Sequence, residues 1–185
     1  MKNKFIIFNE RMVRIEYFLI AVLSIIILGT IFIQVVCRYI LLISTPWAEE
    51  IARYSFIALT YIGSGIGIYN SQFVSVDLMP KIIESTSKNP DRNIKMLEYI
   101  SKFLILLFLM IFLIYYWPYF SKIAKLNQVA VATKIPMVYP MSTIIIGTIF
   151  MIIHCICLLV SNEDERNKVK EELKQEKKIK RVVNG

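Results

Sequence analysis

One group of ionisable residues whose spacing lets them interact lies in the stretch STPWAEEIARYSF. Glu49 lies four residues before Arg53, and Glu50 lies three residues before it. On a helix, side chains three and four residues apart share a face, so either carboxylate can reach the guanidinium. The chemistry that this spacing indicates is ion pairing.

These charges stand at the edge of a strongly apolar segment, where they are costly. A lone arginine at the centre of a bilayer costs about 2.5–3.5 kcal/mol on insertion scales, whereas an exposed i,i+4 ion pair returns only a few tenths of a kcal/mol. One explanation is that Arg53 extends toward the outer headgroups. We expect instead a buried polar cluster of Arg38, Trp47, Glu49, Glu50 and Arg53 that forms or supports a contact with another subunit.

The other residues that could carry chemistry have no suitable partners in the sequence. A bis-histidine haem needs two histidines, and His154 is the only one. Cys155 and Cys157 are one residue apart, which suits neither a disulfide across a helix nor a zinc site. No Ser/His/Asp set and no phosphate-binding loop occurs. We therefore expect no catalytic residue, no metal and no cofactor, and a hydrogen-bonded His154 near the inner end of the last apolar segment.

Four apolar segments must position these residues. The chain is 56% hydrophobic and only 19% charged, more apolar than a soluble domain. A run of about 20 apolar residues can cross a hydrocarbon core about 30 Å thick. The predicted spans are residues 17–36, 51–69, 103–119 and 138–160. We predict an all-α membrane protein with four transmembrane helices over residues 1–160 and a charged tail over residues 161–185.

The second span carries signals for its start and for close packing. Pro46 is favoured at the first position of a helix, and Thr45 before it can cap the helix. Further along, Gly63 and Gly67 are four residues apart. Small residues at this spacing let helix backbones approach closely in lipid. We expect these glycines to be a helix-packing surface.

The basic residues indicate the orientation of the chain. Four precede the first span, five lie between the second and third spans, and eight follow the fourth. Since basic residues in short loops favour the cytoplasmic side, both termini are predicted to be cytoplasmic. The net charge of +8 is then a signal of orientation and of attraction to anionic lipid, and we expect no binding of nucleic acid. The first apolar run is too long for a signal peptide, and no small-residue cleavage site follows it.

The inner loop between the second and third spans contains a partly apolar stretch, FVSVDLMPKIIEST. Its residues Val74, Leu78 and Ile82 approximate helical spacing, although Pro80 interrupts them. This pattern favours a short helix lying in the membrane interface.

The block VVCRYILLISTPWAEEIARYSF resembles the small membrane subunit, DctQ-like, of tripartite ATP-independent periplasmic (TRAP) transporters. The resembling residues are Arg38-Tyr39, then Trp47-Ala48-Glu49-Glu50 and Arg53, with Gly63 in the same span. In the inner loop, Asp77 and its neighbours Val74 and Leu78 fall where the family has a His-Ile-x-x-Asp-Leu run. Phe73 stands at the histidine position of that run, which is a departure from the family pattern.

The resemblance implies a transport role without a transport site. Such a subunit pairs with a large membrane subunit that holds the sodium and substrate sites, and an extracytoplasmic binding protein delivers an organic acid such as a dicarboxylate or sialic acid. The small subunit is then a scaffold in the bacterial cytoplasmic membrane that steadies its partner and helps to dock the binding protein. The residues agree, since translocating chains show repeats and interrupted helices and these spans do not.

Two alternatives remain open from the sequence. One is a homo-oligomeric membrane channel, which would conduct ions when this chain alone is placed in liposomes. The other is an anchor subunit of a membrane redox enzyme, which would purify with a coloured cofactor. The scaffold hypothesis predicts neither result.

Overall fold

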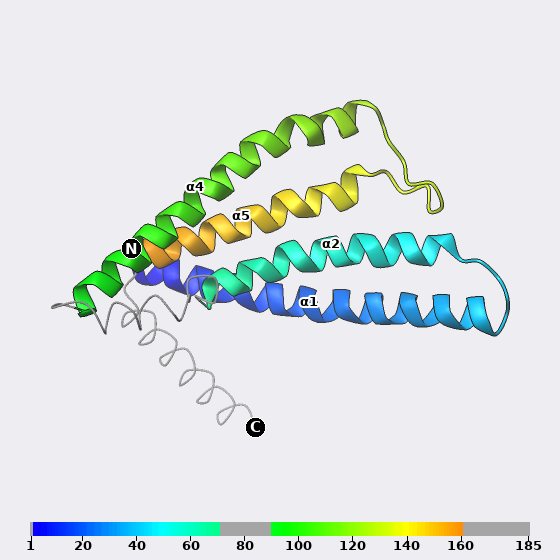
Figure 1. Cartoon of the computed structure of the whole chain (residues 1–185), viewed down its shortest axis with the longest axis horizontal. Coiled ribbons are helices and arrows are strands. Elements are labelled where there is room, and N and C mark those ends of the chain that lie inside the picture. Colours follow the sequence, from blue (N-terminus) through cyan, green and yellow to red (C-terminus); the bar gives the residue numbers. More distant parts are fainter. Residues whose placement is uncertain (1, 71–89, 161–185) are drawn as a thin grey trace, which may run out of the picture.

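The computed structural model describes residues 2–70 and 90–160, which form four helices (Figure 1). Their bounds are Lys2–Tyr39 (α1), Pro46–Tyr69 (α2), Pro90–Lys125 (α4) and Val138–Val160 (α5). In these residues each helix is long and apolar enough to cross a membrane, and the extended pairing consists of one isolated bridge, between Val129 and Pro136. The predicted all-helical protein with four such helices is confirmed. Asp77, the predicted interfacial helix and the charged tail lie outside the described residues.

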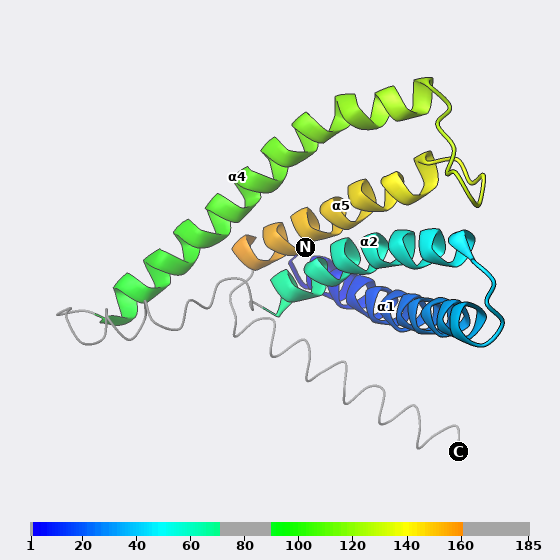
Figure 2. The same ribbon diagram turned by 45° about the vertical axis from the view of Figure 1, so that its right-hand side comes forward.

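The helices run alternately up and down (Figure 1). The start of α1, the end of α2, the start of α4 and the end of α5 lie at the same end of the molecule, called here the terminal end. The connections 40–45 and 126–137 lie at the opposite end, called the loop end. α2 packs against both α1 and α5, and α4 packs mainly against α5. Figure 2 shows α4 as the outermost helix, inclined away from the other three.

The start of α2 agrees with the sequence prediction at Pro46 but not at Thr45. Pro46 occupies the first turn, where its missing N–H costs no helical hydrogen bond. Thr45 does precede the helix, but its side chain makes no capping hydrogen bond. Its hydroxyl oxygen is buried and has no hydrogen-bond partner among the described residues. Thr45 therefore marks the start of α2 without capping it.

The best-packed part of the molecule lies toward the terminal end. Ile68 of α2, Leu109 of α4 and Met151, Cys155 and Leu158 of α5 form one buried cluster. A second cluster joins the start of α1 to the end of α5. By contrast, the most apolar stretches of α1 and α4 are almost entirely unburied within this chain. Lipid or another protein must cover those faces, because exposed apolar patches of this extent are not stable in water.

Helices α2 and α5 approach each other closely at Gly147. A Cβ atom on this glycine would lie 2.7 Å from the backbone carbonyl carbon of Tyr61. Real Cβ atoms do not approach backbone so closely, so only glycine allows this contact. At Gly63, a Cβ atom would meet only the end of Ile20 at 3.7 Å, which is ordinary packing.

Candidate functional site

Glu49 and Arg53 form the ion pair that their spacing allows. A guanidinium nitrogen of Arg53 donates to the carboxylate of Glu49 at 2.6 Å. The two side chains are 58% and 61% exposed within this chain, and the nearby Trp47 is exposed as well. The chain by itself therefore leaves this part of the cluster uncovered.

The carboxylate of Glu50 contacts the connection between α4 and α5. Its carboxylate accepts hydrogen bonds from the backbone N–H groups of Ala132 and Thr133, both at 2.9 Å, and from the Thr133 hydroxyl at 2.8 Å. These donors belong to the connection between α4 and α5, more than 80 residues along the chain. Glu50 thus ties the 126–137 connection to the first turn of α2.

The connection held by Glu50 has a defined shape. Its two arms pair through hydrogen bonds from Ala130 N–H to the Ile135 carbonyl at 2.9 Å and from Met137 N–H to the Gln128 carbonyl at 2.8 Å. Lys134 has a φ of 58° at the turn between them. A single carboxylate that accepts two backbone N–H groups at such a turn fixes the arms relative to α2.

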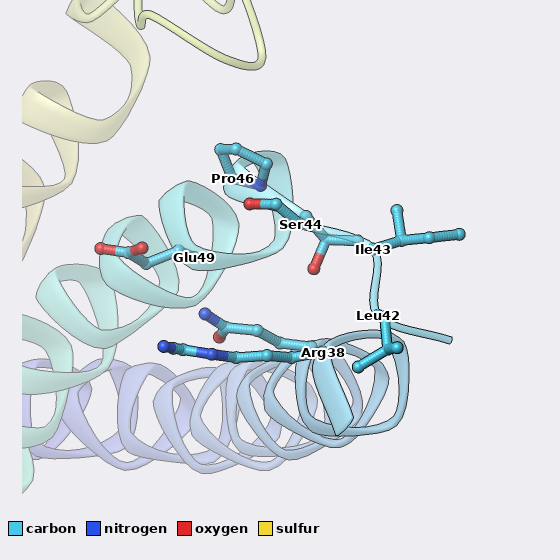
Figure 3. Close-up of a pocket in the computed structure, with 8 residues that line it drawn as sticks. Arg38, Leu42, Ile43, Ser44, Pro46 and Glu49 are labelled. Carbon is cyan, nitrogen blue, oxygen red and sulfur yellow. The ribbon is translucent and has the colours of Figure 1, made fainter. Parts of the chain in front are cut away.

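Arg38 and Glu49 line the same pocket at the loop end, between the end of α1 and the start of α2. Figure 3 shows the Arg38 guanidinium lying along α1 on the side of the pocket that faces Glu49. Gln34, Ser44 and the buried, unpartnered Thr45 hydroxyl also belong to this pocket. The structure therefore brings Arg38, Glu49 and Arg53 to one region, while Glu50 holds the connection between α4 and α5.

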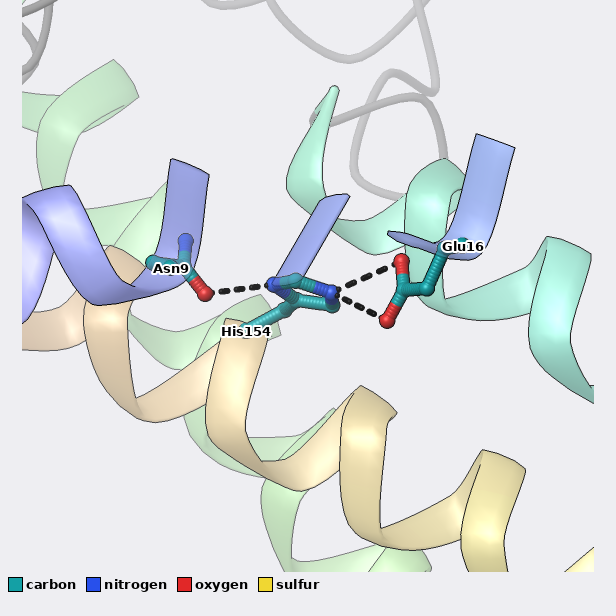
Figure 4. Close-up of polar contacts among 3 residues, drawn as sticks. All are labelled: Asn9, Glu16 and His154. Carbon is teal, nitrogen blue, oxygen red and sulfur yellow. Dashed lines mark hydrogen bonds and ion pairs between the residues drawn. The ribbon is translucent and has the colours of Figure 1, made fainter. Parts of the chain in front are cut away.

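A second polar cluster lies at the terminal end and joins α1 to α5 (Figure 4). His154 Nδ1 lies 2.6 Å from Asn9 Oδ1, and His154 Nε2 lies 2.9 Å and 3.0 Å from the two carboxylate oxygens of Glu16. The exposed fractions of Asn9, Glu16 and His154 are 3%, 0% and 0%. We call these three residues the inner clamp. Buried polar groups of this kind are stable only when they are hydrogen-bonded.

Helix α2 supplies the remaining wall of the inner clamp. A Cβ atom on Gly65 would lie 3.4 Å from a Glu16 carboxylate oxygen and 3.5 Å from the His154 ring. The Tyr69 ring is tilted against the His154 ring, with centroids 5.7 Å apart, and the Tyr69 hydroxyl donates to Glu10. These distances are ordinary packing, so α2 closes this side of the inner clamp by close contact at Gly65.

Sequence reasoning anticipated a hydrogen-bonded His154 but not its partners. Glu16 lies just before the predicted span that begins at residue 17, and Asn9 lies further out still. The signal that could have found them is the spacing of Ile6, Asn9, Val13 and Glu16, which places all four on one face of a helix. That face is buried, while Arg11 and Arg14 are exposed.

The described residues contain no group of three or more His, Cys, Asp or Glu side chains that could hold a metal ion. Both polar clusters consist of ion pairs and hydrogen bonds, which lie within α2 for Glu49 and Arg53 and otherwise join helices and connections. Such contacts position helices and surfaces relative to one another.

Comparison with known proteins gives the family. The family model described as "Tripartite ATP-independent periplasmic transporters, DctQ component" matches residues 27–164, which include the loop-end cluster and His154 but not Asn9 or Glu16. A search of curated proteins found no match. Because the match covers most of the chain and agrees with the four apolar helices, the protein belongs to the DctQ family, the small membrane component of TRAP transporters.

Proposed function

We propose that this chain is the scaffold subunit of a sodium-coupled TRAP transporter for an organic acid. It steadies a large membrane subunit that carries the sodium and substrate sites, and it takes no substrate itself. Membership of the family supports the partnership. Sodium coupling and an organic acid, such as a dicarboxylate or sialic acid, are what the family resemblance implies.

The observation that carries the proposal is the exposed Glu49–Arg53 pair at the loop end of an apolar helix. At 58% and 61% exposure, the pair recovers only a few tenths of a kcal/mol, so it does not offset the cost of placing two charges next to lipid. A covering protein surface with its own polar groups would offset that cost. Trp47, which is exposed in the first turn of the same helix, is a residue type enriched at the centres of protein interfaces.

The apolar faces of α1 and α4 support a partner that is itself a membrane protein. Exposed side chains include Ile25, Leu28 and Phe32 on α1, and Phe103 and Phe108 on α4. Such faces are compatible with lipid as well as with protein, so the polar cluster at the loop end decides where the large subunit binds.

The proposed orientation places the terminal end in the cytoplasm and the loop end outside, in a bacterial cytoplasmic membrane. The distribution of basic residues supports it. The 126–137 connection, held by Glu50, then faces the compartment of the extracytoplasmic binding protein. We propose this connection as a surface that helps to dock that protein.

The test is affinity purification of the tagged chain from its native membrane. The expected result is a large multi-span partner at a one-to-one ratio. Glu49→Arg and Arg53→Glu, made separately, are expected to reduce recovery of that partner. Glu98→Arg is the matched control, because it disrupts another i,i+4 pair, with Lys102, at the terminal end of α4.

Two results would overturn the proposal. One is full recovery of the partner and normal uptake with both loop-end variants, which would make the cluster a solvated surface. The other is ion flux through liposomes that contain this chain alone, which would favour a channel.

A further inference from the structure

The pocket at the loop end, between the end of α1 and the start of α2, has a size and a lining that the proposed scaffold function does not explain. Its volume is about 450 Å³, within the range of about 300–1,000 Å³ that is typical of sites for small molecules. Its polar lining residues are Gln34, Arg38, Ser44, Thr45 and Glu49. A pocket of this size can hold a small polar molecule or part of a lipid.

The donor groups of this lining have no acceptor in the part of the chain that the structure describes. Gln34 and Arg38 are four residues apart on α1, so their side chains share one face of the helix. Neither makes a hydrogen bond or an ion pair with a described residue, and the buried hydroxyl of Thr45 has no partner among the same residues. A guanidinium, an amide and a hydroxyl can all donate, so a ligand with several acceptor oxygens suits this pocket.

The pocket has one positive charge that no described carboxylate balances. Glu49 is paired with Arg53 at 2.6 Å, whereas Arg38 has no acidic partner within residues 2–70 and 90–160. In Figure 3 the polar ends of Arg38 and Glu49 project in the same direction from α1 and α2. The start of α2 borders the same pocket, and the positive end of a helix dipole also favours negative charge. Because a guanidinium can form two parallel hydrogen bonds with a phosphate group, the lining favours a phosphate-type anion with a single negative charge.

The connection beside the pocket is apolar and exposed. It begins with Ile40, Leu41, Leu42 and Ile43, whose side chains are all exposed, and the last two of them line the pocket. Leu42 has a φ of 55°, which bulky residues rarely adopt, and it is 85% exposed. Exposed apolar side chains in a continuous row mark a contact with lipid or protein. The ligand that fits both features is therefore apolar next to its anionic group.

We propose that this pocket binds the phosphate group of a membrane phospholipid. Arg38 and Gln34 donate to the phosphodiester, and the acyl chains lie over the apolar connection and the exposed side chain of Val35 on α1. A phosphodiester carries one negative charge, which balances Arg38, and its acyl chains cover apolar side chains that a free phosphate ion would leave uncovered. The inference does not rest on the proposed scaffold function, which assigns the neighbouring Glu49–Arg53 pair to the large subunit.

The first experiment identifies the occupant in native membranes. Leu42→p-benzoylphenylalanine places a photoreactive side chain at the pocket, and mass spectrometry of the illuminated full chain gives the mass of the attached molecule. We expect an adduct with the mass of one phospholipid, and a severalfold smaller yield when Arg38→Met is added. The control is the same probe at Leu28, an exposed position of α1 outside the pocket, where Arg38→Met should not change the yield of lipid adduct.

Two results of the cross-linking would overturn the proposal. One is attachment of Leu42→p-benzoylphenylalanine to the large subunit in place of a lipid, which would assign the pocket to the protein contact and leave the scaffold function intact. The other is an equal effect of Arg38→Met at both probe positions, which would show general contact with the bilayer. Recovery of the large subunit is a separate measurement, so the failure of either proposal can be recognised without the other.

The second experiment measures binding to the purified full chain. In detergent with added phosphatidylglycerol, native mass spectrometry counts the lipid molecules that the chain retains. We expect Arg38→Met and Gln34→Leu to lower retention of the first lipid severalfold. Lys125→Met is the matched control, because it removes one positive charge at the loop end of α4 from a residue outside the pocket. Equal retention by Arg38→Met and Lys125→Met would overturn the proposal.

Excess inorganic phosphate distinguishes a lipid from a free anion. Because the acyl chains contribute to binding, we expect the retained phosphatidylglycerol to be unaffected by phosphate. Its displacement would show a site for a small anion and would overturn the assignment to lipid. If Arg38→Met does not fold, the comparison of Gln34→Leu with Lys125→Met and the identity of the molecule attached at Leu42 still decide the outcome.

Discussion

Glu50 and Thr133 are joined by two hydrogen bonds, although 83 residues separate them: the Thr133 N–H donates to the Glu50 carboxylate at 2.9 Å and the Thr133 hydroxyl donates to it at 2.8 Å. Glu49, the next residue back, pairs with Arg53 on its own helix. The two adjacent carboxylates therefore have different structural roles. One holds a connection to the helix, and the other is part of an exposed ion pair.

Removing the Glu50 carboxylate should loosen the 126–137 connection. In Glu50→Ala, the N–H groups of Ala132 and Thr133 lose their common acceptor, and the turn at Lys134 becomes more mobile. We expect trypsin to cut after Lys134 severalfold faster in the purified protein, as measured by mass spectrometry. Glu49→Ala is the matched control and should leave this cleavage unchanged. Equal cleavage in the two variants would contradict the role of Glu50.

Adding a methyl group at Gly147 should separate α2 from α5. A Cβ atom there would lie 2.7 Å from Tyr61 backbone and side-chain atoms, and the backbone cannot yield as a flexible side chain would. Gly147→Ala is expected to cost about 1–3 kcal/mol of stability, as overpacking does, and to lower the midpoint of thermal unfolding in detergent. Gly29→Ala is the control, because a Cβ atom there meets nothing within 4 Å. Equal midpoints for the two variants would exclude a tight α2–α5 contact.

The fold follows from the sequence to the extent that its causes are local. Apolar runs longer than a bilayer is thick predict the four helices, and an i,i+4 spacing predicts the Glu49–Arg53 pair. Hydropathy does not show that α1 starts at Lys2, because the buried face of its first turns includes the polar residues Asn9 and Glu16.

Contacts between distant segments could not be predicted from the sequence. The Glu50–Thr133 contact and the inner clamp depend on which helix faces meet, and one sequence does not specify that. The same applies to glycine. Gly63 and Gly67 form a recognisable pattern and stay predicted packing residues, whereas a close approach of two backbones occurs at Gly147, which has no partner glycine at a regular spacing. A single glycine gives no periodic signal.

Removing one hydroxyl should weaken the attachment of α4 at the loop end. Tyr116 of α4 donates to the backbone carbonyl of Met141 on α5 at 3.1 Å. Tyr116→Phe keeps the ring, which stacks with Phe112, and removes only the donor. We expect a loss of about 0.5–1.5 kcal/mol, seen as a lower midpoint of thermal unfolding. Tyr115→Phe is the control, because Tyr115 is exposed; a larger loss with Tyr115→Phe would contradict this assignment.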